Sequence, residues 1–255
     1  MDFLISAHTD IGIRKNTNQD SVLLQVAQTN YGKTAFGVVC DGMGGLAKGE
    51  LASATLIKEF ANWFLNDFGL LLAEGFDVAR LNQMWRDIVE NTNIKITEYG
   101  KRNRLNLGTT LTAILIFNEH YYCINVGDSR VYQIRDSLYQ ITKDQSYIQR
   151  EMDMGRMTPE EAKRDPQRNV LLQCVGASPI VVPDFFTGEV RQGDVYMLCS
   201  DGFRHILEPS ELYEYLNPDS MNTEEEMKEN IVYLTELNKY RREDDNISVA
   251  VIKTV

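Results

Sequence analysis

The sequence lacks the features that would place it in a membrane, on nucleic acid or in the secretory pathway. Its longest apolar runs, such as residues 112–117, are far shorter than the roughly 20 residues that cross a bilayer. Acids outnumber bases, and the net charge of −11 argues against binding to nucleic acid or to an anionic membrane surface. The N-terminal residues lack a basic segment followed by a long apolar core, so we expect no secretory signal.

Cysteine and proline are also scarce. The four cysteines are widely spaced without a CxxC pair, and three lie in apolar, strand-like runs; they are Cys40, Cys123, Cys174 and Cys199. This pattern favours buried, reduced thiols over a zinc site, and it indicates a cytoplasmic protein. With six prolines, no low-complexity tract and no shift in composition, we expect a single domain over residues 1–255.

Short runs rich in Val, Ile, Leu and Tyr predict β-strands. They lie at residues 20–27, 35–40, 109–117, 121–126, 130–135, 138–141, 194–199 and 246–252. Helical spacing of apolar residues predicts helices over 50–68 and 81–99, and an acidic first turn predicts a third over 223–240. Turns within a meander of adjacent strands are expected at Gly127-Asp128 and Arg135-Asp136. Runs of strands with grouped helices indicate an α+β fold in which helices cover a sandwich of sheets.

Aspartates stand at the ends of several predicted strands, most of them beside Gly or Asn. They are Asp20, Asp41, Asp128, Asp201 and Asp245. A carboxylate at the rim of a core is costly to desolvate, and several at one rim raise one another's pKa values. Mg²⁺ and Mn²⁺ relieve both penalties because they prefer oxygen ligands. The pattern therefore favours a site for divalent cations, provided that these strand ends meet.

Each aspartate taken singly has a plainer explanation as a turn former that hydrogen-bonds its own backbone. We assign Asp136 and Asp194 to that class. Five aspartates in strand-end settings shift the balance toward metal binding, but spacing alone leaves their convergence open.

The residues around these aspartates resemble the motifs of the PPM (type 2C) metal-dependent protein phosphatases in their compact bacterial form. In chain order they are Asp10-Ile-Gly-Ile-Arg14 with Asn18-Gln19-Asp20, Asp41-Gly42-Met43-Gly44-Gly45 with Gly49-Glu50 and Ala52-Ser53, Gly108-Thr109-Thr110-Leu111, Asn125-Val126-Gly127-Asp128-Ser129-Arg130, Leu198-Cys199-Ser200-Asp201-Gly202 and Asp245-Asn246-Ile247-Ser248-Val249. A single motif would be weak support, but the ordered set spans nearly the whole chain and is specific.

The resemblance implies a four-layer αββα sandwich, with a central antiparallel β-sandwich flanked by helix pairs. It also implies that six residues hold metal ions, namely Asp20, Asp41, Gly42 through its carbonyl, Asp128, Asp201 and Asp245. Asp41 would bridge two core Mg²⁺ or Mn²⁺ ions and the nucleophilic water, while Asp128 and Asp201 would share a weaker third ion. Residues 146–179 would form a flap segment near the cleft.

By the same resemblance the protein hydrolyses phosphoserine and phosphothreonine on other proteins and opposes a Ser/Thr kinase in signalling, as a monomer. Two ions about 4 Å apart can activate a water for in-line attack on phosphorus. Arg14 becomes the candidate phosphate clamp, because a guanidinium can bind two oxygens at once. Without the motif, a surface position would be the plainer explanation for Arg14.

Two departures from the motifs of the family leave the identity of the general acid open. Met43 stands where many eukaryotic members carry His, and Gln19 stands where many members carry Glu. His205 is a candidate, although a structural role near a helix start is plainer, and His8 and His120 are expected to be structural or exposed.

Two other functions also stay open. One is a non-catalytic binding module of the same fold, but the presence of all the expected metal ligands disfavours it. The other is a metallohydrolase that acts on nucleic acid or on a small phosphoester, but the excess of acidic residues disfavours it.

Overall fold

Two antiparallel sheets form the centre of the molecule, for which a computed structural model describes residues 1–44 and 48–255. The first sheet has the order β1 (Phe3–Asp10), β12 (Ile247–Thr254), β11 (Val195–Cys199), β8 (Arg130–Ile134) and β9 (Leu138–Gln140). The second has the order β10 (Asp184–Glu189), β7 (His120–Val126), β6 (Leu111–Phe117), β3 (Gly32–Cys40) and β2 (Ser21–Thr29). A short ladder pairs β4 (Gly42–Gly44) with β5 (Leu107–Thr109).

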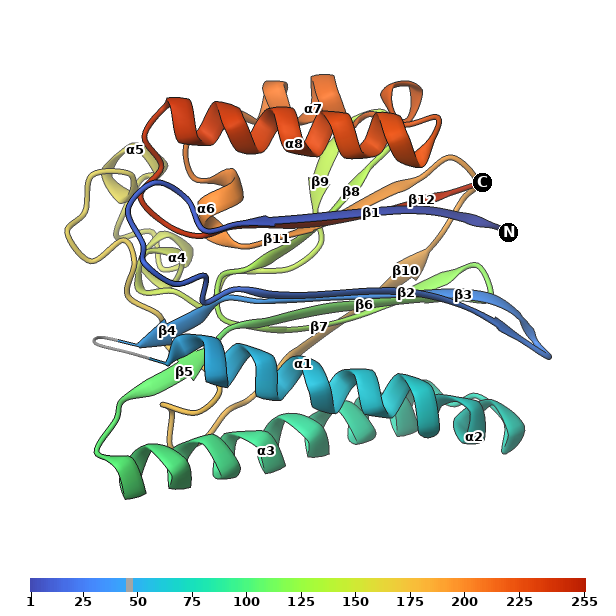
Figure 1. The fold of residues 1–255 in the computed structure, drawn as a ribbon, viewed down its shortest axis with the longest axis horizontal. Coiled ribbons are helices and arrows are strands. Elements are labelled where there is room, and N and C mark those ends of the chain that lie inside the picture. The colour runs from blue at the N-terminus through green and yellow to red at the C-terminus, as the bar shows by residue number, and fades with distance from the viewer. Residues whose placement is uncertain (45–47) are drawn as a thin grey trace.

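Helices cover the outer face of each sheet (Figure 1). The second sheet is covered by α1 (Gly49–Asn66), α2 (Phe68–Ala73) and α3 (Val78–Asn103), and the first by α7 (Pro209–Leu216) and α8 (Glu224–Tyr240). Shorter helices are α4 (Tyr147–Asp153), α5 (Pro159–Ala162), α6 (Asp201–Arg204) and the 3₁₀ turn Pro218–Ser220. The predicted α+β fold and its four-layer αββα arrangement are thus confirmed. Across the described part of the chain, no helix is both long and apolar enough to cross a membrane.

Central strands are buried on both faces, which explains their continuous apolar sequences. Every residue of β6 and of β11 is buried. In β3, Val39 packs into the core between the sheets, while Phe36 faces the helices and stacks on Phe64 with ring centroids 4.9 Å apart. The sandwich therefore encloses three apolar layers, one between the sheets and one under each group of helices.

Most predicted strands and helices are found close to their predicted positions. The prediction misses the strands β1, β4 and β10 and the helices α2, α4, α5, α6 and α7. Strand β10 is only partly buried, so its sequence lacks a clear apolar pattern. The acidic start of α8 is confirmed, and Thr223 caps it by accepting a hydrogen bond from the Glu226 amide at 3.1 Å.

The turn at Gly127-Asp128 differs from its prediction. Strands β7 and β8 belong to different sheets, so this turn crosses from one sheet to the other instead of joining neighbours. Gly127 has a φ of +98°, and a Cβ there would lie 2.7 Å from a methyl carbon of Thr110. The predicted meander is wrong at this point, whereas Arg135-Asp136 does join the neighbouring strands β8 and β9. The crossover places Asp128 at an end that both sheets share.

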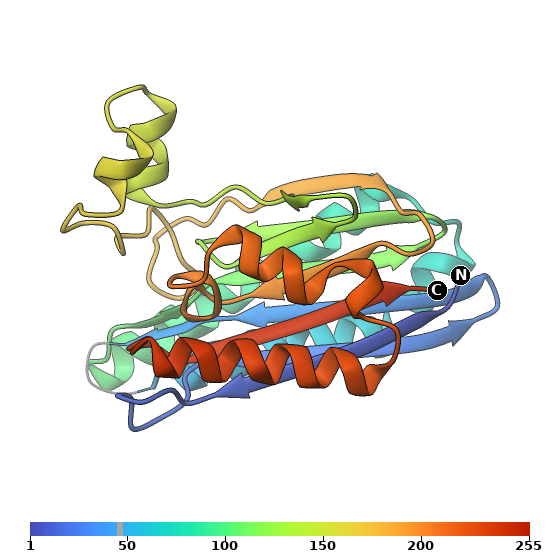
Figure 2. The same ribbon diagram turned by 90° about the horizontal axis from the view of Figure 1, so that it is seen from above.

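The segment expected to form a flap, residues 146–179, projects from one end of the sandwich (Figure 2). It contains α4 and α5, and α5 begins with a capping box between Thr158 and Glu161. Two backbone hydrogen bonds between Thr109 and Val175, each 2.9 Å long, tie its far end to β5.

Asp194 combines the expected turn with a buried ion pair. Its carboxylate accepts a hydrogen bond from the Arg191 amide at 2.8 Å, as a turn former does. The side chain is only 1% exposed, however, and Arg135 contacts both of its oxygens at 2.5 Å. Asp136 is exposed, as the turn assignment predicts. Asp194 is therefore a structural residue remote from the candidate metal ligands.

We expect Asp194→Asn to lower the free energy of unfolding at neutral pH by about 2 kcal/mol, because Arg135 loses its partner. Burial would raise the pKa of Asp194, but the bonds from Arg135 and Arg191 outweigh it and lower the pKa. A lowered folded-state pKa stabilises the protein above the unfolded value of about 4, and this stabilisation is lost as the pH falls through the folded-state pKa. In urea titrations the deficit of the variant should therefore shrink below about pH 4. A deficit that stays constant over that range would contradict the role of the ion pair.

Candidate metal centre

Strand register brings Asp20 and Asp41 to one end of the second sheet. Ser21 of β2 pairs with Cys40 of β3 in the antiparallel ladder. The aspartates lie just outside this pair, one before β2 and one after β3. They therefore flank the same sheet end.

Strand register also brings Asp201 and Asp245 to one end of the first sheet. Cys199 of β11 pairs with Val249 of β12. Asp201 begins α6 two residues after Cys199, and Asp245 lies just before β12. Together with the crossover at Asp128, these chain segments meet at the end of the sandwich near β4 and α6 (Figure 1).

Asn246 ties the two sheets together at this end. Its Oδ1 accepts a hydrogen bond from the Gln19 amide at 2.9 Å, and its Nδ2 donates to the Ile11 carbonyl at 2.9 Å. The Gln19 carbonyl in turn accepts from the Gly42 amide at 3.2 Å and from the Ser53 hydroxyl at 2.6 Å. The aspartates next to Gln19 and Asn246 are thereby held across the gap between the sheets.

Two threonines fix the backbone of Asp41. Its amide donates to the Thr110 hydroxyl at 2.9 Å, and its carbonyl accepts from the Thr110 amide at 2.9 Å and from the Thr109 hydroxyl at 3.0 Å. A Cβ on Gly42 would lie 2.4 Å from the Gln19 carbonyl oxygen, so only glycine fits there. These contacts explain physically why the Gly-Thr-Thr-Leu and Asp-Gly motifs occur together.

Asp201 and Asp245 lie close enough to alter the protonation of Asp20 and Asp41. Burial, and then the charges of Asp20, Asp201 and Asp245, raise the pKa of Asp41 well above its usual range. Burial also raises the pKa of Asp20 to about 7, and Asp201 and Asp245 add to this shift. Nearby positive charge is therefore needed if all of these groups are to be ionised at neutral pH.

The carboxylate of Asp20 is buried without hydrogen bonds. The residue is 8% exposed, and neither of its carboxylate oxygens has a partner among the described residues. The Ser200 and Ser248 hydroxyls oppose the rise in its pKa, but neither makes a well-formed hydrogen bond with it. Asp201 likewise has one buried, unpartnered oxygen within the described ranges. Unsatisfied carboxylate oxygens of this kind fit a hard cation.

Lys15 supplies a positive charge to the carboxylates. Its Nζ lies 2.7 Å from Asp245 Oδ1. Burial would lower the pKa of Lys15, but Asp245, followed by Asp41 and Asp201, outweighs burial and raises it. The ammonium group thus stands in for a metal cation and marks a place where positive charge is favoured. Sequence reasoning missed this residue.

Arg14, the predicted phosphate clamp, points elsewhere. Its Nε pairs with Asp244 Oδ1 at 2.8 Å, and its side chain is 69% exposed. Neighbouring residues in a turn direct their side chains differently, and the sequence carries no signal for which of two adjacent cations faces inward. The structure brings Lys15, and not Arg14, to the carboxylates.

Asp128 lines a cavity of about 540 Å³ between the sandwich and the flap segment. Asp201 and Arg204 line it on the sandwich side, and Lys163 and Arg168 line it on the flap side. Burial raises the pKa of Asp128 to about 7, Asp201 adds to the shift, and Arg204 opposes it. The cavity therefore joins part of the carboxylate cluster to basic side chains of the flap.

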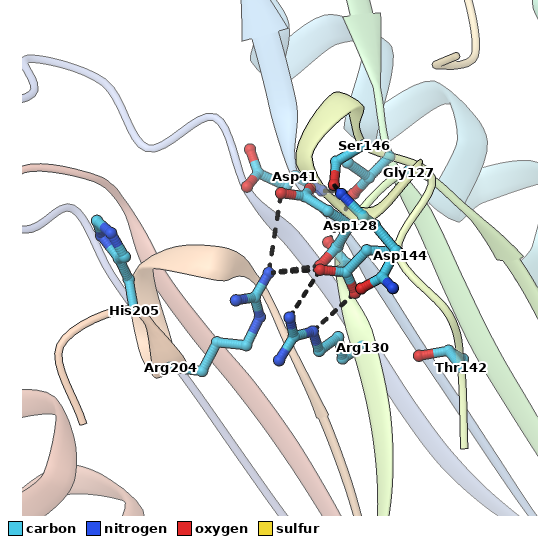
Figure 3. Close-up of polar contacts among 12 residues, drawn as sticks. Asp41, Gly127, Asp128, Arg130, Thr142, Asp144, Ser146, Arg204 and His205 are labelled. Carbon is cyan, nitrogen blue, oxygen red and sulfur yellow. Dashed lines mark hydrogen bonds and ion pairs between the residues drawn. The ribbon is translucent and has the colours of Figure 1, made fainter. Parts of the chain in front are cut away.

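His205, the histidine considered for acid catalysis, lies away from the centre of the carboxylate cluster. His205 Nδ1 is 3.2 Å from Glu243 Oε2, and this contact raises the pKa of His205. Its imidazole stands apart from the labelled carboxylates (Figure 3). His120 is exposed, and Met43 lies in β4 opposite Gly108. Gly45, the last glycine of the second motif, lies outside the described residues.

The residues present fit divalent cations of the magnesium type. Within residues 1–44 and 48–255, no three acidic, histidine or cysteine side chains are arranged so that they could hold one metal ion together. Mg²⁺ does not need three, since it usually keeps several waters and binds only one or two carboxylates. The unpartnered Asp20 oxygens, the raised pKa values of Asp20 and Asp41 and the ammonium of Lys15 all indicate that cations are favoured here.

Comparison with known proteins identifies the family of this chain and agrees with its fold. The family model for protein phosphatase 2C matches residues 12–240. The chain belongs to the protein phosphatase 2C family, a class of phosphoprotein phosphatases, which confirms the resemblance read from the motifs.

Relatives support this assignment over the whole chain. The serine/threonine protein phosphatase PstP of Mycobacterium tuberculosis is 34% identical over 98% of the chain, although the chain spans only 45% of the length of that protein. The serine/threonine phosphatase stp of Listeria innocua is 30% identical over 96% of the chain and 93% of its own length.

Solved structures share the fold. A serine/threonine phosphatase from S. agalactiae aligns over 100% of both chains with a TM-score of 0.86 at 27% identity. The catalytic domain of PstP, solved in complex with two manganese ions, aligns over 98% of this chain and 97% of its own with a TM-score of 0.78 at 30% identity. That complex agrees with the expected dependence on Mg²⁺ or Mn²⁺.

We expect Asp20→Asn to stabilise the metal-free protein while weakening Mn²⁺ binding. The raised folded-state pKa of Asp20 destabilises the fold increasingly as the pH rises from about 4 toward about 7. In EDTA at neutral pH the variant should melt about 3 °C above the wild type, and in saturating Mn²⁺ the order should reverse. Thermal-shift curves check both, with the exposed Asp136→Asn as a control that follows the wild type. Lower stability of Asp20→Asn in EDTA would contradict the electrostatic assignment.

Proposed function

We propose that this protein hydrolyses phosphoserine and phosphothreonine in proteins with water activated at a pair of Mg²⁺ or Mn²⁺ ions. The observation that supports the proposal best is the meeting of acidic strand ends at one edge of both sheets, with the Asp20 carboxylate buried and unpartnered among the described residues. Family membership and the relative solved with two manganese ions support the same chemistry.

Four aspartates would hold the ions, with the Gly42 carbonyl as a further ligand: Asp20, Asp41, Asp201 and Asp245. When bound, such ions lower the pKa of a shared water and offset the charge that builds up on the phosphoryl oxygens. Asp41 is the proposed bridging ligand, because its carboxylate responds to all the others and its backbone is fixed from both sides by Thr109 and Thr110. A rigid Asp41 keeps the attack in line with the departing serine or threonine oxygen.

Cysteine chemistry is a poor alternative for this protein. All four cysteines are free and buried. Burial raises the pKa of Cys40 and Cys123 well above the usual value and that of Cys199 to about 12. Thiolates are therefore scarce at neutral pH, and a cysteine nucleophile is disfavoured. Free, buried thiols also support our proposal that the protein works in the reducing cytoplasm.

We further propose that the substrates are phosphorylated proteins, among them a Ser/Thr kinase and its targets, and that the chain acts as a monomer. Lys163 and Arg168 beside the cavity offer positive charge to a phosphorylated, acidic segment. The net charge of −11 disfavours nucleic acid as a substrate.

Wild-type protein with Mn²⁺ should release phosphate from phosphoserine and phosphothreonine peptides. Asp41→Asn should reduce kcat/KM by about 10³-fold or more, because the bridging ligand loses its charge. A phosphate-release assay measures both, with Asp136→Asn as the exposed control that retains full activity. An inactive wild type, or an Asp41→Asn variant with undiminished activity, would count against the proposal.

The same assay separates the competing functions. A non-catalytic binding module would bind phosphopeptides without turnover, and calorimetry would show no Mn²⁺ binding. A different phosphoester hydrolase would turn over nucleotides faster than phosphopeptides under the same conditions.

Lys15 and Arg14 are rival phosphate ligands, and their variants distinguish them. Arg14 remains the prediction from the motif, but its ion pair with Asp244 must open before it can reach phosphate. Lys15 is also held in an ion pair, with Asp245, but this pair already places its ammonium group among the carboxylates of the proposed metal centre. We expect Lys15→Gln to lower kcat/KM by about 10-fold to 100-fold, the effect of one charge-assisted hydrogen bond, and Arg14→Gln to lower it less.

Steady-state kinetics on one phosphopeptide check this order. The control is Lys33→Gln, since Lys33 pairs with Asp2 far from the site and should leave kcat/KM unchanged. A larger loss in Arg14→Gln than in Lys15→Gln would restore Arg14 as the clamp.

A further inference from the structure

Arg204 places a positive charge beside Asp128, the residue expected to hold a third metal ion. Arg204 is the last residue of α6 and Asp201 is the first, so one short helix carries both an expected ligand and a guanidinium. The Arg204 Nη2 donates to the Asp128 main-chain carbonyl at 2.8 Å and lies 3.8 Å from Asp128 Oδ2. The guanidinium is directed at Asp128 (Figure 3).

This contact is partly buried. The Arg204 side chain is 13% exposed and that of Asp128 is 14% exposed. An arginine keeps its charge even when it is buried, so nearby carboxylates must balance it. The guanidinium is therefore a fixed part of this end of the sandwich and differs from a surface side chain that can swing away.

Arg130 is the partner of Asp144, the other carboxylate in this group. Its Nε and Nη2 donate to the two oxygens of Asp144, each at 2.7 Å (Figure 3). Its Nη1 donates to the Tyr132 hydroxyl at 2.7 Å. Arg204 Nη2 lies 3.6 Å from Asp144 Oδ2 and 3.8 Å from Asp128 Oδ2, so it acts on both carboxylates through its charge and not through a hydrogen bond. Because Asp144 is already bonded to Arg130, Asp128 is the carboxylate whose charge Arg204 balances.

We propose that Arg204 is the resident cation at Asp128 and takes the place of a third divalent ion, so that the protein binds two ions and Asp128 is not a metal ligand. This proposal rests on the metal centre proposed above and limits it to two ions, with Asp128 outside the set of ligands. A third ion shared by Asp128 and Asp201 would lie against the guanidinium, and like charges at such short range repel each other. Asp144, which could offset an added charge, is already bonded to Arg130.

The role of Asp128 then becomes one of positioning. Through Arg204 it holds the C-terminal end of α6, whose N-terminal residue is the expected metal ligand Asp201. The charge of the guanidinium is permanent, so the occupancy of this position does not vary with the concentration of free metal.

Counting bound Mn²⁺ by isothermal titration calorimetry tests the proposal on the full chain. Wild type should bind two ions, and Asp128→Asn should bind two ions with unchanged affinities. Arg204→Gln should gain a third, weaker ion at Asp128, and the double variant with Asp128→Asn should lose it again. Arg102→Gln, an exposed change on α3, is the matched control and should bind two ions.

Three ions in the wild type, the loss of an ion in Asp128→Asn, or only two ions in a folded Arg204→Gln would each overturn the proposal. Circular dichroism checks folding. If Arg204→Gln does not fold, the number of Mn²⁺ ions bound by Asp128→Asn tests the proposal by itself. A wild type that binds no Mn²⁺ would overturn the proposed metal centre together with this inference, whereas three ions would leave the phosphatase function standing.

Discussion

Mutual repulsion among clustered carboxylates is the constraint on which the functional end of this molecule depends. The fold brings Asp20, Asp41, Asp201 and Asp245 to one end of the sandwich, and the charges of Asp201 and Asp245 help to raise the pKa values of the more deeply placed Asp20 and Asp41. Such a cluster destabilises the folded state unless positive charge is present. The chain supplies part of that charge through Lys15, while the unpartnered Asp20 carboxylate leaves room for cations from solution.

The rest of the sandwich makes this arrangement rigid. Apolar layers on both faces of each sheet fix the strand register, and register alone decides which strand ends lie side by side. The side-chain oxygens of Thr110 and Asn246 accept hydrogen bonds from the amides of Asp41 and Gln19, and these bonds hold the backbone beside the acids. Close approach at Gly42 leaves no space for a side chain next to Asp41. Stability contributed by the core thus offsets the electrostatic penalty at the rim.

Local pattern predicted most strands and all the strand-end aspartates, because each acid adjoins an apolar run that is visible in the sequence. Sheet order is a long-range property, so Gly127-Asp128 was mistaken for a hairpin turn when it crosses between sheets. The inward direction of Lys15 and the outward direction of Arg14 depend on the conformation of a turn. Arg204 gave no local signal, since its partner Asp128 lies 76 residues away in the chain.

Anomalous diffraction from crystals soaked in Mn²⁺ tests most directly whether these carboxylates trap paired cations. Two peaks on either side of the Asp41 carboxylate, each about 2.1 Å from aspartate oxygens, are the predicted result. An absence of peaks beside Asp41, or peaks confined to other surfaces, would contradict it.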